Sequence, residues 1–380
     1  MKSVSTYKAA NVVAETIEAI FSNHVATATN LGEENLAAVP NASQIESFID
    51  VGFWTSLRQE EGRSPRISLA FLSPEQSTNH IQFAQHVPFT PTALTKISAG
   101  YERAGIHLCV WQQDNDLYVW GATLTIPNYC FVLDISEAGQ VVIKNRRVDG
   151  FGKFSNIAVL AGDEIKIVDE LNSTNGSCPQ IVSSLINFAP DSTTDNSINV
   201  LLQLAVSMRA HKRGGTLLMV PSDSKEWRES ISHPLHYAIK PTFSGLADLM
   251  KQNTIDNSIE NWQVFLSKEV DIIAGLTAID GATIINDEYK LLAFGEKIVQ
   301  RAGRPIIETL IETEPIKDNN PTVVSPSKTG GTRHLSAAQF VQDQPKAIAL
   351  VASQDGRFTV FSWSTKDHSV QAHRIDSLLL

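Results

Sequence analysis

Hydrophobic residues follow three successive patterns along this chain, and the first two lie in its N-terminal half. Between residues 6 and 23 apolar side chains recur at helical spacing, which predicts an amphipathic helix. From residue 106 to residue 168, short alternating segments separated by turn residues predict a mostly antiparallel sheet. The strands expected in this sheet are residues 108–111, 117–120, 130–134, 141–144, 157–160 and 164–168.

The third pattern begins after a polar, proline-broken stretch, residues 187–196, which predicts a linker or surface loop. A helical apolar stripe follows and runs into a buried strand at residues 216–220, and helices and strands then alternate to the C-terminus. This organisation predicts an α+β, strand-rich domain over residues 1–190. It also predicts an α/β domain over residues 196–380, with a central mixed sheet flanked by helices. The stripe consists of Ile198, Leu201, Leu202, Ala205 and Met208.

Composition is compatible with two domains and argues against nucleic-acid binding. The chain has 380 residues, of which 42% are hydrophobic, enough for two cores. A formal net charge of −10 gives no general attraction to nucleic acid or anionic lipid, so we expect neither partner. The densest basic run, residues 144–147, is short, and we interpret it as a solvated strand end or turn.

The cysteines and the hydropathy of the chain indicate the cellular compartment of the protein. The three cysteines are odd in number and lack metal-type spacing, which predicts free buried thiols in a reducing cytoplasm. No stretch reaches the ~18 apolar residues that a membrane helix needs, and the N-terminus has no signal-peptide core. We therefore expect a soluble cytoplasmic protein that does not bind membranes. The cysteines are Cys109, Cys130 and Cys178.

Two short segments, about 50 residues apart, carry the strongest candidate chemistry. In residues 279–285 an apolar strand adjoins Asp280, Gly281 and Ala282. The missing or small side chains after the carboxylate let another molecule's backbone or sugar approach closely. Asp280 therefore suits a ribose or a metal ion.

The second segment, residues 330–338, is a glycine-rich turn that leads into a helix predicted over residues 336–341. It presents a hydroxyl, a guanidinium and an imidazole, from Thr332, Arg333 and His334. Free N–H groups and the positive dipole end at a helix start favour phosphate, and the fork of Arg333 matches phosphate oxygens. Together the two segments describe a nucleotide site.

These segments resemble the Asp-Gly-Ala and Gly-Thr-Arg-His-Arg signatures of the diadenylate cyclase domain family, whose members join two ATP into cyclic di-AMP. Three other stretches resemble that family in the same order: residues 213–221 its early buried strand, residues 292–298 the segment after Asp-Gly-Ala, and residues 351–356 its closing strand and turn. The resemblance covers about residues 196–378, roughly half the chain. Residues 1–190 resemble, more loosely, the sensor-type domain often placed before such cyclases.

The resemblance implies that two ATP-loaded domains face each other in a homo-oligomer, each donating a 3′-hydroxyl to the other's α-phosphate. Asp280 would be the catalytic residue that orients or deprotonates this hydroxyl. Asp280 and His334 would be the ligands of a Mg²⁺ or Mn²⁺ ion that favours pyrophosphate departure. The nucleotide-binding set that it implies is Asp280, Gly281, Ala282, Gly331, Thr332, Arg333, His334 and Ser353.

Two departures from the family pattern keep the question of catalysis open. Leu335 stands where family members usually carry a second arginine, which removes a charge and five donors. Leu335 either weakens the hold on the triphosphate or points into the helix packing. Ser353 and Gln354 stand nearest to a family acidic residue, and glutamine binds Mg²⁺ more weakly than a carboxylate.

Three functions are therefore compatible with the sequence. The favoured one is synthesis of cyclic di-AMP from ATP. The alternatives are a non-catalytic sensor that binds ATP or cyclic di-AMP, and an interaction protein that retains a relic fold. Binding without turnover would favour the sensor, and no nucleotide binding at all would favour the relic.

Several other patterns imitate sites and are better interpreted as structure. Residues 172–176 form an Asn/Ser/Gly turn, and the spacing of Ser325 and Lys328 is accidental. His233 and His236 are separated by a proline, which favours a surface loop over a metal site. Residues 312–330 are polar and proline-broken, which predicts a long loop of functional or disordered type beside the phosphate turn.

Overall fold

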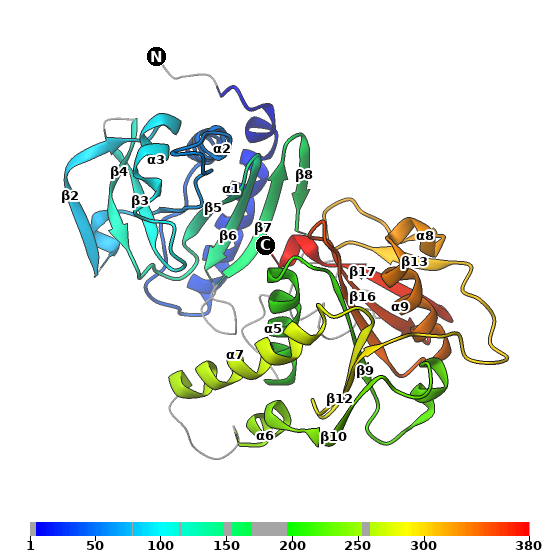
Figure 1. Cartoon of the computed structure of the whole chain (residues 1–380). Helices are drawn as coiled ribbons and strands as arrows, with labels where there is room; N and C mark the ends of the chain where they lie inside the picture. Colours follow the sequence, from blue (N-terminus) through cyan, green and yellow to red (C-terminus); the bar gives the residue numbers. More distant parts are fainter. Residues whose placement is uncertain are drawn as a thin grey trace. The chain divides into compact units, whose positions relative to one another are not determined.

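The chain forms two compact units, Met1–Val168 with Leu380, and Asp169–Leu379. The expected linker and the 172–176 turn lie outside the described residues, apart from Asn196, and Cys178 lies outside them too. The computed structural model describes residues 5–77, 79–113, 116–146, 154–168, 196–252 and 259–379 (Figure 1).

The first unit is built on an eight-stranded sheet of order β2-β4-β3-β1-β5-β6-β7-β8. Only β1 and β3 pair in parallel; every other neighbouring pair is antiparallel. The mostly antiparallel, strand-rich α+β fold predicted for this half is confirmed. Its elements are α1 (Lys8–Asn30), α2 (Ala42–Ser56), β1 (Ser68–Phe71), the 3-10 turn η1 (Pro74–Gln76), β2 (His80–Pro88), α3 (Pro91–Ser98), β3 (His107–Gln113), β4 (Asp116–Thr123), β5 (Phe131–Glu137), β6 (Gln140–Arg146), β7 (Phe154–Ala161) and β8 (Glu164–Ile167).

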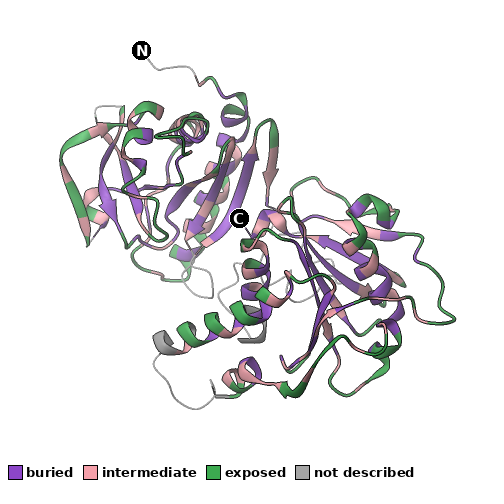
Figure 2. Ribbon diagram, in the orientation of Figure 1, coloured by how far each residue is buried: buried purple, intermediate pink, exposed green. Residues whose placement is uncertain are grey.

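Helix α1 explains how the first unit closes its core. The apolar stripe of the predicted helix is buried in the structure, and Ile17 and Phe21 are fully inaccessible. The ring of Phe21 lies 5.2 Å from that of Phe131 on β5, and Phe48 of α2 meets Phe131 edge-on at 5.3 Å. The buried strands behind these helices stand out in Figure 2. The helix ends at Asn30 rather than at residue 23 because the polar last turns still hydrogen-bond along the helix, as Thr27 and Thr29 do.

In the basic run, residues 144–146 lie on β6 and are buried or half-buried rather than solvated, which contradicts the interpretation as a solvated strand end for these residues; residue 147 lies outside the described residues. Lys144 lies on β6, and its Nζ is 2.6 Å from the Asp134 carboxylate on β5. Asn145 is fully buried and donates a hydrogen bond to Nδ1 of His24 at 3.0 Å. The ion pair and the hydrogen bond offset part of the cost of burying these polar groups.

Cys109 and Cys130 are free, buried thiols, as expected. Burial raises the pKa of Cys109 to about 12 and raises that of Cys130 as well, so neither forms a reactive thiolate near neutral pH. Among the described residues no helix is both long and apolar enough to cross a membrane.

The second unit holds a nine-stranded mixed sheet of order β10-β12-β11-β9-β15-β16-β17-β13-β14. Two neighbouring pairs, β9 with β11 and β13 with β17, are parallel, and the others are antiparallel. Its elements are α5 (Asn196–Ala210), β9 (Gly215–Val220), the 3-10 turn η3 (Glu226–Ser230), β10 (Tyr237–Phe243), α6 (Gly245–Gln252), α7 (Ile259–Leu276), β11 (Ala282–Asn286), β12 (Leu291–Glu296), β13 (Leu310–Thr313), β14 (Thr322–Val324), α8 (Pro326–Thr329), α9 (Thr332–Asp343), β15 (Ile348–Ala352), β16 (Phe358–Ser364), β17 (Ser369–Arg374) and the 3-10 turn η4 (Asp376–Leu378).

Helices cover both faces of this sheet, which confirms the α/β class predicted for the C-terminal half. Successive residues of β9 point to opposite faces. Leu217 belongs to a core shared with α5, α6 and α7, whereas Leu218 belongs to a core shared with α9. Figure 1 shows helices α5 and α7 on one side of the sheet and α9 on the other.

The long loop expected over residues 312–330 is a hairpin followed by a short helix, so that prediction is wrong. Leu310 pairs with Val324 and Glu312 with Thr322 in an antiparallel β13–β14 ladder. β14 is the outermost strand of the sheet. The polar composition of these residues suggested a loop, but an edge strand also has polar residues because it exposes side chains that an inner strand would bury.

Buried His373 should make the stability of the second unit depend on pH. Burial lowers its pKa from 6.5 to about 4, and its Nδ1 is 2.7 Å from the Thr313 hydroxyl. Between pH 6.5 and pH 4 the His373 side chain is protonated in the unfolded chain but neutral in the folded one. The free energy of unfolding therefore decreases as the pH falls through this range. The free energy of unfolding should drop by about 2 kcal/mol between pH 8 and pH 5 through this residue alone.

Urea unfolding of the wild type and of His373→Gln at these two pH values measures the effect. The difference in pH dependence between the two proteins isolates His373 from the carboxylates, which titrate in both. An identical loss of stability in wild type and variant would show that His373 accepts a proton in the folded state.

Candidate functional site

Strand register in the second unit gathers three chain segments at one edge of the sheet. Thr216 of β9 pairs in parallel with Ala282 of β11, so these two strands begin side by side. β15 runs the opposite way, and its last residue, Ala352, pairs with Gly215. The start of β9, the start of β11 and the end of β15 therefore meet at the same edge. Asp280 and Ser353, adjacent to these strand ends, are brought to that edge.

Asp280 and Gly281 lie in a bend before β11 rather than inside a strand. The Asp280 side chain is exposed. Gly281 has a φ of +103°, and a Cβ there would lie 2.5 Å from the carbonyl carbon of Gly295. The close approach that this glycine permits is thus by the chain's own β12 backbone. The bend holds the Asp280 carboxylate at the surface next to a tightly packed corner.

Helix α9 begins at Thr332, four residues before the predicted start at residue 336. Thr332, Arg333 and His334 therefore form its first turn, and the exposed Gly331 is its N-cap. The predicted helix began too late because the first turn of α9 is polar and lacks the apolar residues that mark the rest of the helix. No side chain of the described residues caps the helix start, so its N–H groups and positive dipole end favour an anion.

Arg333 is the predicted residue whose position the structure defines most closely. Its Nη1 lies 2.8 Å from the point where a Cβ on Gly214 would sit, and Gln354 Cγ lies 3.4 Å from the same point. Gly214, with φ of +70°, thus leaves room for the guanidinium beside the end of β15. Arg333 therefore reaches the edge at which Asp280 and Ser353 also lie.

His334 is buried, 3% exposed, and its Nε2 has no hydrogen-bond partner among the described residues. The ring packs against Gly330 and meets Phe361 of β16 edge-on at 6.0 Å. Burial lowers the pKa of the imidazole, so His334 is neutral near pH 7 and does not add a positive charge. Asp355 opposes this shift, and three guanidiniums reinforce it: Arg357, Arg374 and Arg333.

The described side chains do not form a metal centre by themselves. A neutral imidazole and an exposed carboxylate are suitable donors in kind. No group of three or more His, Cys, Asp or Glu gathers anywhere in the described ranges, however. His233, set aside above as a ligand, donates from Nε2 to the carbonyl of Arg228 at 2.8 Å, as a structural loop residue does. His334 and Asp280 stay predicted ligands of a Mg²⁺ or Mn²⁺ ion.

The two departures from the family pattern have different surroundings. Leu335 is 42% exposed, so its side chain does not enter the core, and that alternative is excluded. Gln354 donates from Nε2 to the carbonyl of Arg213 at 3.3 Å, which ties the turn after β15 to the segment before β9. The hydrogen bond from Ser353 lowers the pKa of Asp355, so Asp355 is ionised in this turn.

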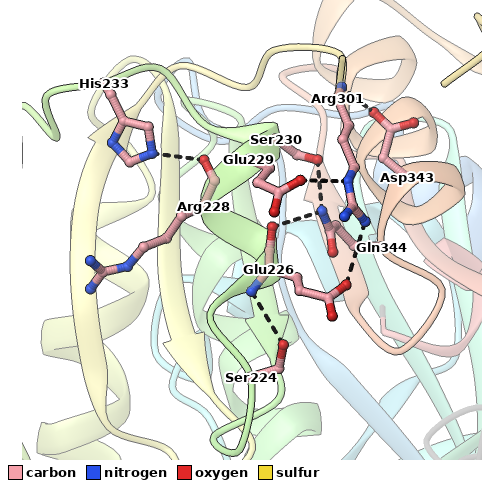
Figure 3. Close-up of polar contacts among 9 residues, drawn as sticks. All are labelled: Ser224, Glu226, Arg228, Glu229, Ser230, His233, Arg301, Asp343 and Gln344. Atoms are coloured by element: carbon pink, nitrogen blue, oxygen red, sulfur yellow. Dashed lines mark hydrogen bonds and ion pairs between the residues drawn. The ribbon is translucent and has the colours of Figure 1, made fainter. Parts of the chain in front are cut away.

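A polar network holds the far end of α9 and so directs its first turn to the sheet edge (Figure 3). The fully buried carboxylate of Asp343 accepts from the backbone N–H of Arg301 at 2.8 Å and from Gln339 Nε2 at 2.9 Å. Gln344 Nε2 donates to Ser230 Oγ at 2.9 Å and to the Glu226 carbonyl at 3.1 Å. Arg301 also pairs with Glu229 at 2.7 Å and with Glu226 at 3.4 Å.

An aromatic pair that the sequence did not reveal stands beside Asp280. Tyr237 of β10 and Phe294 of β12 stack with ring centroids 4.9 Å apart and planes 3° from parallel. Tyr237 is 51% exposed. A Cβ built on Gly295 would lie 2.9 Å from Cδ2 of Tyr237 and 3.4 Å from the carbonyl oxygen of Asp280, so the ring and the Asp280 backbone flank the same glycine. The buried Glu296 carboxylate accepts from the backbone N–H of His236 and Tyr237, at 3.2 and 3.0 Å, and fixes the strand start.

An exposed aromatic ring held this way is a surface on which a nucleobase can stack. The pairing depends on the register between β10 and β12, which lie about 50 residues apart in the chain. Tyr237 follows His236 in a proline-containing polar stretch, and no local pattern distinguishes it.

Comparison with known proteins concerns the first unit. Residues 34–124 match the family model described as the probable sensor domain DACNV. No curated protein matches the chain. The expectation of a sensor-type domain is confirmed for the matched residues, which extend from before α2 to the end of β4. The chain thus carries a probable sensor domain of the DACNV type, in the unit that does not contain the candidate site.

Proposed function

We propose that residues 196–380, nearly all of which lie in the second unit, form a diadenylate cyclase-type domain that condenses two ATP to cyclic di-AMP and pyrophosphate. The observation that supports this most is the convergence of Asp280, Arg333 and the uncapped start of α9 at one sheet edge. The DACNV match adds weight, because this probable sensor domain is the N-terminal domain of diadenylate cyclase-like proteins. The predicted sensor-type domain, residues 1–190, would then regulate this cyclase-type domain.

In this proposal each group at the edge has a distinct task. The exposed Asp280 carboxylate accepts the proton of the ATP 3′-hydroxyl. The 3′-oxygen then bonds to the α-phosphorus of the second nucleotide, whose bond to pyrophosphate breaks. Arg333 and the N–H groups of Gly331 and Thr332 hold the phosphates. Tyr237 provides the flat surface for the base, and a bound Mg²⁺ or Mn²⁺ would offset phosphate charge.

One domain provides only half of such a site. A symmetric cyclic dinucleotide requires two nucleotides related by a two-fold axis, so two copies of the chain must face each other. The partners proposed for this protein are therefore ATP, its product cyclic di-AMP and a second copy of the chain. Neither nucleic acid nor membrane has a place in this scheme.

A non-catalytic nucleotide sensor is the second candidate. Three observations favour it: Leu335 provides no guanidinium, the Gln354 amide is used on the Arg213 carbonyl, and the described residues form no metal cluster. Incubation of the full chain with ATP and Mn²⁺, read by mass spectrometry, separates the two candidates. Cyclic di-AMP supports the enzyme, ATP binding without product supports the sensor, and absence of both indicates a relic fold.

Replacing Asp280 with Asn should abolish product formation while leaving the fold and ATP binding intact. The change is nearly isosteric and removes the proton acceptor, which should cost about 10²–10⁴-fold in turnover. Mass spectrometry of product and calorimetry of ATP binding check the two halves of this expectation. Asp318→Asn, which alters another exposed carboxylate, is the matched control. Turnover within twofold of wild type would remove Asp280 from the catalytic role.

Replacing Leu335 with Arg should strengthen ATP binding without destabilising the protein. Leu335 is 42% exposed, so the new guanidinium stays in solvent and pays no burial penalty. A charged hydrogen bond to phosphate should contribute about 1.5–3 kcal/mol, measured by calorimetry. Ile306→Arg, at a side chain that is 68% exposed, controls for the added charge. Equal affinities in both variants would show that position 335 does not face the phosphates.

A further inference from the structure

Three arginines from separate segments act electrostatically on His334. Arg333 lies on the first turn of α9, Arg357 precedes β16, and Arg374 ends β17. All three act on the imidazole of His334, as its lowered pKa reflects. Phe358 and Val360 of β16 point into the core under α5 and α7, so Thr359 between them points to the α9 face of the sheet. Arg374 is paired with Thr359 and therefore lies on the same face. Arg357, two residues before Thr359, also falls on that face.

The carboxylates around Arg374 and Arg357 differ in number. Arg374 lies within 3.9 Å of Glu312, Glu314 and Asp376, so its charge is already neutralised inside the protein. Arg357 has one ion pair among the described residues, with Asp355 at 3.4 Å, and both side chains are more than half exposed. A single exposed pair is weak, so a polyphosphate can compete for Arg357. Of the two, Arg357 is the guanidinium free to meet a ligand.

Besides the uncapped start of α9, a second and independent observation points to a ligand at this edge of the sheet. Nε2 of His334 is buried and lacks a hydrogen-bond partner among the described residues, although native proteins satisfy nearly all such groups. The groups that act on this ring include Arg333 from the first turn of α9, and Arg357 and the ionised Asp355 from the segment between β15 and β16. A buried, unsatisfied ring nitrogen next to two guanidinium forks indicates that a ligand completes the site.

We propose that Arg357 is a second phosphate-binding residue of this site and that, with Arg333, it clamps the polyphosphate of a nucleoside triphosphate. It would supply from the β15–β16 turn the second guanidinium that position 335 lacks. Two forks on opposite sides bind a chain of phosphates, whereas a nucleoside without phosphate engages neither. The inference rests on the proposed nucleotide site and deepens it by assigning its second cationic contact.

Calorimetry of the full chain with ATP, and with adenosine as a probe that lacks phosphate, tests this assignment. Arg357→Ala should weaken ATP binding about tenfold or more and change adenosine binding less than twofold. Arg357→Lys should recover part of the loss, because it restores the charge without the fork. Arg304→Ala, at an exposed arginine in the loop after β12, is the matched control and should leave both affinities unchanged.

The outcomes separate this inference from the proposed function. If Arg333→Ala weakens ATP binding while Arg357→Ala behaves like Arg304→Ala, the role of Arg357 is wrong and the nucleotide site stands. An equal loss of ATP and adenosine binding in Arg357→Ala would also overturn the role, since it would indicate a structural effect. Absence of ATP binding by the wild type would overturn both.

Discussion

The candidate site depends on one constraint, the hydrogen-bonded register of β9 with its two neighbours. β11 lies parallel to β9 on one side and β15 antiparallel on the other, so two strand beginnings and one strand end reach the same edge. A slip of one residue in either ladder would turn Leu217 and Leu218 to the wrong cores and exchange the faces of the sheet. The hydrophobic layers therefore enforce the register, and the register in turn places Asp280 and Ser353.

The second half of the site is positioned by polar contacts rather than by the sheet. Asp343, at the far end of α9, is fully buried, and a buried carboxylate is stable only when its oxygens are hydrogen-bonded. Gln339 donates to this carboxylate from within α9, and the Arg301 backbone N–H ties the end of the helix to the segment after β12. The uncapped start of the same helix faces the opposite way and leaves its donors available. One end of α9 is thus satisfied internally, and the other is prepared for an anion.

Local pattern was sufficient for much of the fold and for part of the site. Strands β3 to β8 of the first unit and helix α5 were predictable, because alternation and helical spacing reflect burial directly, whereas β1 and β2 were not predicted. The start of α9 was missed because its polar first turn breaks the apolar stripe. The β13–β14 hairpin was missed because an edge strand exposes side chains that resemble those of a loop. The role of Tyr237 could not be predicted, because its stacking on Phe294 depends on the pairing of two strands, β10 and β12, that are distant in the sequence.

The nucleotide is proposed to bind in the second unit, whereas residues 34–124 of the first unit match a probable sensor domain. Hydrogen–deuterium exchange of the full chain with and without ATP and Mn²⁺ tests that location most directly. ATP binding at the proposed site should slow amide exchange in three segments: residues 279–282, 330–335 and 353–357. The matched residues 34–124 serve as the internal reference, because the ATP site proposed here lies outside them. Unchanged exchange in all three segments, or protection confined to other parts of the chain, would contradict the claim.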